Sequence, residues 1–192
     1  MVKRLRTPLF LLAIAGLLGA GVYWSESRKS LLQPEAQSDT SQPIVAALER
    51  DIEALTIKTV AQTLVLDKIS STGWMLRSPK PEGKASETSV AFLTNLLVGK
   101  GDRLPAIAAD RKAEFGLNQP LATVEIQLPN QQRQTLVLGN LNFNRTGRYA
   151  AVNPSVDPNA NVSILLVSPN FESAVTRAIS EWRSAPVKSP AK

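Results

Sequence analysis

The chain has 192 residues, with no cysteine and no histidine, and a formal net charge of +6. These absences exclude a disulfide framework, a zinc–thiolate site, a cysteine nucleophile and the side chain most often used as a general base near neutral pH. The charge does not indicate nucleic-acid binding, because residues 51–183 hold fourteen basic and twelve acidic side chains that are interspersed along the sequence.

The first element is an apolar segment, LFLLAIAGLLGAGVYW, which spans Leu9–Trp24 and follows a basic start at residues 1–8. A basic flank, an apolar core and an aromatic rim are typical of an N-terminal membrane segment. At ~1.5 Å per residue it covers about 24 Å of the ~30 Å hydrocarbon core, and Arg6 can snorkel to the interface. We expect residues 9–25 to form a single-pass anchor. The N-terminus is then cytoplasmic, and the rest of the chain lies on the periplasmic or extracytoplasmic side.

A cleaved signal peptide is the competing interpretation, because Gly19-Ala20-Gly21 places small residues at a cleavage position. The large side chains of Tyr23 and Trp24 just beyond it favour a retained anchor. A lipid anchor is excluded, since there is no cysteine to acylate. Both remaining interpretations place the following domain outside the cytoplasm.

Residues 26–50 are rich in Ser, Gln, Glu and Asp and are predicted to be a polar linker. Its part up to Gln42, with Ser25 a spacer of 18 residues, is interpreted as flexible and holds the next domain about 20–25 Å from the bilayer. After this spacer, Pro43 and the sequence IVAALERDIEAL predict a short helix before the first strand.

Residues 51–183 are predicted to form one extracytoplasmic domain, and residues 184–192 a tail without ordered structure. Alternating apolar and polar residues, or short apolar runs bounded by turn residues, predict its strands. These strands are 55–59, 64–68, 73–77, 104–109, 123–128, 133–138, 148–152 and 162–167.

Two helices are predicted. One runs from the N-cap Ser86 to Val98 and buries Val90, Leu93 and Leu97. The other helix has Ser168 as its predicted N-cap and Pro169 as its first residue. Its apolar residues continue at helical spacing to Trp182, which we expect to be buried in the core. The apolar residues of this second helix are Phe171, Ala174, Val175, Ala178, Ile179 and Trp182.

The two halves of the domain repeat one order, a hairpin, a further strand and a helix. We infer a degenerate tandem repeat. The predicted fold class is α+β, an antiparallel sheet with two packed helices, preceded by one N-terminal transmembrane helix.

Four motifs occur in order: GWMLRSP at Gly73–Pro79, FGLNQP at Phe115–Pro120, LVLG at Leu136–Gly139 and RYAAV at Arg148–Val152. Together they resemble the bacterial domain-of-unknown-function family 4340. The resemblance implies a membrane-anchored extracytoplasmic accessory domain that accompanies gliding-motility or transporter-associated proteins, and it supplies no catalytic residues. Asn118 and Leu121 depart from the Asp and the basic residue that are common in that family.

Two groups of side chains are candidate sites. Arg77, Lys80 and Lys84, with Lys100 and Arg103 expected nearby, are interpreted as loop surface, with a lipid-headgroup or acidic-partner role as the alternative. Trp74 is expected in the core, with ligand stacking as its alternative.

The second group consists of Asp102, Asp110 and Glu114, which lie close in sequence and offer carboxylates for acid–base work. Arg103, Arg111 and Lys112 are interleaved with them, so salt-bridged surface is the better interpretation.

The sequence predicts no catalytic residue, no cofactor-binding residue, no metal ligand and no cofactor, and we expect the protein not to be an enzyme. The expected function is that of an accessory or interaction domain associated with a membrane complex such as a transporter. Its expected partners are the bilayer, through residues 9–25, and a membrane protein, but no nucleic acid. The alternatives are an extracytoplasmic ligand-binding module for lipid, peptide or cell-wall material, and a carboxylate-based hydrolase.

Overall fold

A computed structural model describes residues 41–70 and 73–184. The predicted N-terminus (1–8), the predicted anchor (9–25), the linker up to residue 40 and the tail from residue 185 lie outside these described residues. Within the described ranges, no helix is long and apolar enough to cross a membrane.

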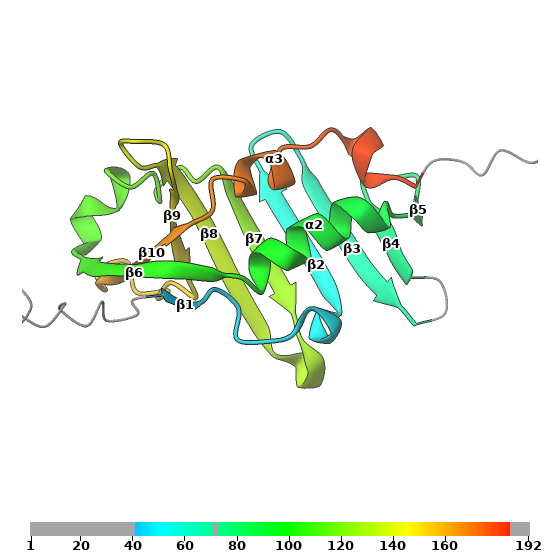
Figure 1. Ribbon diagram of the computed structural model, residues 1–192, viewed down its shortest axis with the longest axis horizontal. Helices are drawn as coiled ribbons and strands as arrows, with labels where there is room; N and C mark the ends of the chain where they lie inside the picture. The colour runs from blue at the N-terminus through cyan, green and yellow to red at the C-terminus, as the bar shows by residue number, and fades with distance from the viewer. Residues whose placement is uncertain (1–40, 71–72, 185–192) are drawn as a thin grey trace, which may run out of the picture. The chain divides into compact units, whose positions relative to one another are not determined.

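In the described part of the chain, ten strands form one antiparallel sheet (Figure 1). They are β1 (Ser41–Pro43), β2 (Ala54–Thr59), β3 (Thr63–Ile69), β4 (Gly73–Ser78), β5 (Gly83–Lys84), β6 (Lys100–Ile107), β7 (Ala122–Gln127), β8 (Arg133–Leu141), β9 (Arg148–Val152) and β10 (Val162–Val167). Together with two helices, this confirms the predicted antiparallel α+β domain. The short edge strands β1 and β5 were not predicted.

The order of the strands is centred on the pairing of β2 with β7, where Ala54 lies opposite Gln127 and Thr59 opposite Ala122. From this pair, β3, β4 and β5 follow on one side, and β8, β9 and β10 on the other, before β6 and β1. Each half therefore starts at the centre of the sheet and proceeds outward, and each ends in a helix.

The main core lies between one face of the sheet and the helices α2 (Glu87–Leu97) and α3 (Phe171–Val175). Strand alternation sends Leu55 and Ile57 of β2, and Val124 and Ile126 of β7, to this face, where they are fully buried. Burying side chains of this size contributes roughly 1.5–3 kcal/mol each.

Helix α2 forms as predicted. The Ser86 side chain accepts a hydrogen bond from the Ser89 N–H, at 3.3 Å, and so satisfies one of the unpaired N–H groups of the first turn. Val90, Leu93 and Leu97 are buried on the face that packs on the sheet. The helix lies across the sheet in Figure 1.

A second, smaller core lies on the opposite face, over β6, β10, β9 and part of β8. It contains Ile107, Ala151, Val162 and Ile164. Phe115, which follows the 3-10 helix η2 (Ala109–Ala113), packs against it. The Phe115 and Tyr149 rings meet edge to face with their centroids 4.8 Å apart. This second core covers only one half of that face.

The start of the domain differs from the prediction. Residues Ser41–Pro43, assigned to the linker, form β1 and pair with β6. Ile44 and Val45 are buried in the main core, and their N–H groups bond to the carbonyls of Gly99 and Leu97. The folded domain therefore includes residues 41–50, which were predicted to belong to the linker. The helix predicted after Pro43 is reduced to the 3-10 turn η1 (Glu49–Asp51), because these early residues pair with the α2–β6 connection instead.

The last helix also differs, since it is not continuous to Trp182. Helix α3 ends at Val175, Ala178 is extended and exposed, and Ile179–Trp182 form the 3-10 helix η4. The break lets the Trp182 carbonyl accept a hydrogen bond from the Ser86 N–H at 2.9 Å, at the start of α2. Trp182 is fully buried, as predicted.

Candidate functional site

The half of the sheet made by β4, β3, β2, β7 and β8 presents a polar surface on the face opposite the helices. Side chains alternate along each strand, so the neighbours of the buried Leu55 and Ile57 point to this surface. Several reach solvent: the side chain of Asp67 is 41% exposed and that of Lys58 50%. We call this surface the open face. Its residues are Ala54, Thr56, Lys58, Val65, Asp67, Met75, Arg77, Thr123, Glu125, Gln127, Arg133 and Thr135.

The register brings the open-face residues into rows. Thr56 lies opposite Glu125, and Glu125 opposite Thr135. In the next row, Ala54 lies opposite Gln127, which faces Arg133. The centre of the open face is thus the β2–β7 pairing, where the two halves of the domain meet.

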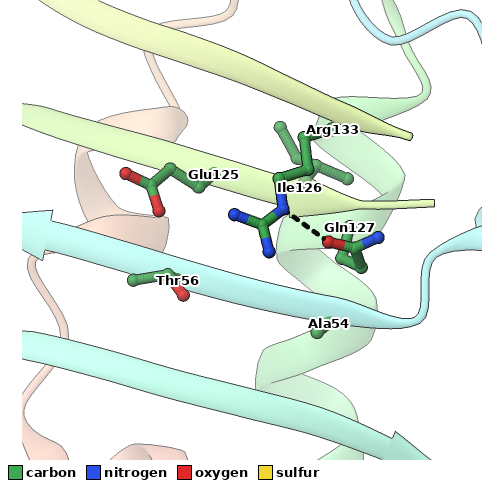
Figure 2. A pocket seen from close by; sticks show the side chains of 6 residues that line it. All are labelled: Ala54, Thr56, Glu125, Ile126, Gln127 and Arg133. Atoms are coloured by element: carbon green, nitrogen blue, oxygen red, sulfur yellow. Dashed lines mark hydrogen bonds between the residues drawn. The ribbon is translucent and has the colours of Figure 1, made fainter. Parts of the chain in front are cut away.

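A shallow hollow of about 190 Å³ lies over this centre (Figure 2). Its lining residues are Ala54, Thr56, Glu125, Ile126, Gln127 and Arg133. Figure 2 shows the Arg133 guanidinium over β7, between Glu125 and Gln127, and its Nε donates to Gln127 Oε1 at 2.9 Å. The small Ala54 side chain leaves room beside these longer groups.

The charges around the hollow are balanced. Lys58 Nζ lies 2.5 Å from Glu125 Oε1. On the neighbouring strands β3 and β4, Arg77 Nε lies 3.0 Å from Asp67 Oδ2. The hollow therefore offers donors and acceptors side by side without a strong excess of either sign. Such a lining can pair with a polar side chain of another molecule, whereas ordinary ligand pockets measure about 300–1,000 Å³.

A second hollow, of about 260 Å³, is lined by Glu49, Arg50, Lys68, Trp74 and Thr94. Hydrogen bonds hold two of its groups: Thr94 Oγ1 donates to Glu49 Oε1 at 2.5 Å, and Lys68 Nζ donates to the Arg50 carbonyl at 2.8 Å. Trp74 packs against the main core but is only half-buried, so the prediction of a core tryptophan is met in part.

The predicted basic cluster is neutralised and divided. Arg77 pairs with Asp67 and Glu82, and Lys80 also pairs with Glu82. Hydrogen bonds from Lys80 and Arg77 lower the pKa of the Glu82 carboxyl, because they stabilise its charged form.

Lys84 of this cluster pairs with Glu87 at 3.1 Å. The expectation that Lys100 and Arg103 lie nearby is wrong. They belong to β6, near the opposite edge of the sheet from β4 and β5, because β6 pairs with β10 instead of continuing the first half.

The predicted carboxylates are also placed. Asp102 lies on β6 and Asp110 on η2, while Glu114 makes an ion pair with Arg111 at 2.7 Å. A hydrogen bond from Arg111 lowers the pKa of Glu114. Across residues 41–70 and 73–184, no three acidic side chains gather in a way that could hold a metal ion. The salt-bridged interpretation is met for Glu114.

The open face was not predicted as a site. Its signal in the sequence is the outward set of Thr, Glu, Gln and Arg residues on β2, β7 and β8, but the register that joins them is not readable from one sequence.

The fold and this surface define an α+β domain with an antiparallel sheet that is covered on one face and half covered on the other. No protein-family model matches the chain, and neither a curated protein nor a solved structure gives a match. The resemblance to family 4340 stays a prediction.

Proposed function

We propose that this protein is a single-pass membrane protein whose extracytoplasmic domain is a non-catalytic accessory module. In this proposal residues 9–25 hold the domain at the bilayer, and the open face binds a protein of a membrane complex such as a transporter. The observation that carries the proposal is the open face itself, a polar sheet surface five strands wide with a small hollow at its centre.

The size of the open face favours a reversible contact. Strands about 4.8 Å apart and about 20 Å long give five strands an area of roughly 500 Å². A standard interface buries about 800 Å² per partner, and weak, transient complexes lie below about 600 Å². The mixture of Thr56, Glu125 and Arg133 suits a wet, polar interface of this kind.

The runner-up is a ligand-binding module, supported by the hollow beside Trp74, where an aromatic ring lies near Arg50 and Lys68. Its volume admits a group the size of one side chain or sugar fragment rather than a whole lipid.

Peptide addition at a sheet edge is disfavoured. Pro43 ends β1 on one edge, and Pro105, which has no N–H, lies in the neighbouring β6. On the other edge, the Ser184 N–H bonds to the Lys84 carbonyl beside β5. A carboxylate-based hydrolase is disfavoured by the ion pairs of Glu114 and Glu125.

The strand order, in which each half of the domain starts at the centre of the sheet and proceeds outward, supports an origin of the domain by tandem duplication. Each half starts at β2 or β7 and ends in α2 or α3. On this proposal, the hollow lies at the junction between the two copies.

The test is site-specific photo-crosslinking of the full chain in its native membrane. A photoreactive amino acid replaces Thr56 or Thr135, at separate places on the open face, and the products are identified by mass spectrometry. We expect the same membrane protein to be recovered from both positions. Its recovery should be lost when Thr123→Arg adds a bulky charge on β7, the strand between them, one row along from both positions.

The matched control carries the photoreactive group at Val156, which is fully exposed in the loop between β9 and β10 and is not an open-face residue. Recovery of the same product from position 156 would mean that the contact is not made by the open face. No common product from positions 56 and 135 would contradict the accessory role and shift attention to the hollow beside Trp74.

A further inference from the structure

The turns at one end of the sheet carry two apolar side chains that contact solvent alone. Val60 lies in the turn between β2 and β3 and is 99% exposed, and Phe143 lies in the loop between β8 and β9 and is 104% exposed. Since β2 and β8 both pair antiparallel with β7, they run in the same direction and these two turns leave the sheet at the same end (Figure 1).

The loop that holds Phe143 is ordered by hydrogen bonds among its own polar groups. Asn142 Oδ1 accepts from the Gly147 N–H at 3.1 Å, and the exposed Asn144 accepts through its Oδ1 from Thr146 Oγ1 at 2.7 Å. The aromatic side chain between them points outward. Because internal hydrogen bonds already order the loop, docking Phe143 against an apolar phase costs little further conformational entropy.

The turn that holds Val60 repeats this arrangement. Thr59 Oγ1 donates to the Gln62 carbonyl and accepts from the Gln62 N–H, both at 3.1 Å, and Gln62 Nε2 donates to the Arg177 carbonyl. Val60 remains outside these bonds. Two ordered turns at one end of the domain thus present an apolar side chain at their tips.

The two turns themselves suit an anionic surface, although Glu82 and Glu172 follow strands β4 and β10, which end at the same end of the sheet. Residues 59–63 (TVAQT) and 141–147 (LNFNRTG) contain no acidic residue, and Arg145 follows Phe143 by two positions. At the opposite end, Asp157 is next to the exposed Val156, and residues 49–53 contain Glu49, Asp51 and Glu53.

The first described residue, Ser41, lies close to the loop that holds Phe143. Ser41 lies in one row with Asp102, Leu166 and Tyr149, and Tyr149 is two residues beyond the loop that holds Phe143. Three strand spacings, or about 14 Å, separate Ser41 from Tyr149. A flexible chain of 15 residues spans roughly 20 Å, so the proposed anchoring of residues 9–25 is compatible with contact between this loop and the bilayer.

We infer that the turns carrying Val60 and Phe143 dock into the interface of the lipid bilayer, with Arg145 at the headgroup phosphates, and thereby orient the domain on the membrane. An apolar side chain at the acyl boundary beside a cation at the headgroups is the usual chemistry of interfacial attachment. This inference rests on the proposed anchoring of residues 9–25.

The test uses the full chain, whose lack of cysteine allows one cysteine to be introduced cleanly. Val60→Cys, Phe143→Cys and Val156→Cys variants are labelled with an environment-sensitive fluorophore. They are then reconstituted into vesicles of phosphatidylcholine and phosphatidylglycerol. We expect a blue shift and quenching by doxyl-labelled lipid at positions 60 and 143, and neither at position 156.

A second variant keeps the test independent of the label at position 143. In the Val60→Cys background, Phe143→Ser and Arg145→Gln should each reduce quenching at position 60, and since both side chains are exposed the fold should be unaffected. Equal quenching at all three labels, or a blue shift that appears without vesicles, would overturn the inference in favour of random orientation or contact with protein.

Vesicle flotation separates this inference from the proposed anchor. A chain that floats with the vesicles while labels 60 and 143 stay unquenched keeps the anchor and overturns the docking. A chain that does not float overturns both.

Discussion

Arg148 of β9 and Glu172 of α3 form an ion pair, with Nη2 and Oε2 2.5 Å apart, that joins the sheet to the last helix. The two partners differ in environment, because the arginine side chain is 6% exposed and the glutamate 50%. Arg148 Nη1 also donates to the Gly139 carbonyl, whereas its Nε is buried and has no hydrogen-bond partner among residues 41–70 and 73–184. Most of the cost of this pair is therefore the desolvation of the arginine, which Glu172 offsets.

Glu172→Gln should destabilise the domain by roughly 1–3 kcal/mol, because a buried guanidinium loses its only carboxylate among the described residues. Adding Arg148→Met in the same chain should recover part of this loss, since the buried charge is then gone. Urea unfolding of both variants measures the difference. An unchanged midpoint in Glu172→Gln would show that water already satisfies the guanidinium.

Trp182→Ala should cost about 3–5 kcal/mol, the usual penalty for truncating a buried aromatic side chain. Trp182 is fully buried between α2 and the sheet and anchors η4, which follows the break after α3. Trp74→Ala is the matched control and should cost less, because Trp74 is half-buried. A change below ~0.5 kcal/mol for Trp182→Ala would mean that the last segment is not docked.

Gly139→Ala should be strongly destabilising, because a Cβ at this position would lie 2.1 Å from the Phe115 carbonyl oxygen. Backbone atoms cannot yield as a flexible side chain does, so we expect a loss of roughly 1–3 kcal/mol or more, with release of the second core. Gly83→Ala is the control, since its Cβ would meet only the Arg183 Nη1 at 3.6 Å. Thermal melts of the two variants should differ clearly, and equal melting temperatures would contradict the close approach.

Acid should weaken the domain through Glu82 and Glu114. Hydrogen bonds from Lys80 and Arg77 to Glu82, and from Arg111 to Glu114, lower the pKa of each carboxyl in the folded state from its usual value of 4.5. Such a group contributes stability that is present above the unfolded pKa and is lost as pH falls through the folded pKa. The melting temperature should therefore fall below about pH 4.5.

Both pairs are exposed, so this contribution is small and salt should screen it. In the double variant Glu82→Gln, Glu114→Gln, the melting temperature should fall less steeply below about pH 4.5 at low salt. At high salt the double variant and the natural chain should show the same fall. Between about pH 6 and 8 the melting temperature should stay constant, because the chain has no histidine or cysteine to titrate. A step in that range would contradict this account.

The proposed topology can be tested by labelling, since the natural chain contains no cysteine. A cysteine introduced at Val156, which is fully exposed, should react with a membrane-impermeant maleimide in intact spheroplasts. One introduced at Val2 should react only after permeabilisation. The reverse pattern would overturn the proposed orientation, and release of the position-156 variant in a shorter, soluble form would favour a cleaved signal peptide.

The sequence by itself determined the local elements of the described domain. Alternation along Leu55–Thr59 and Thr123–Leu128 predicted β2 and β7, because a strand with one buried face repeats every two residues. The Ser86 cap and the spacing of Val90, Leu93 and Leu97 predicted α2 for the corresponding helical reason.

Only the tertiary structure decided the rest, because those features depend on partners distant in sequence. Ser41–Pro43 carry no strand pattern and become β1 by pairing with β6, and the apolar spacing up to Trp182 does not prevent a break at Ala178. The open face arises because register sets Thr56 beside Glu125, and because the segment around Phe115 covers only β6, β10, β9 and part of β8. Local periodicity indicates which side of a strand is apolar. Which polar residues meet depends on strand pairing, and which remain open to a partner depends on the segments that pack on the sheet; both are non-local.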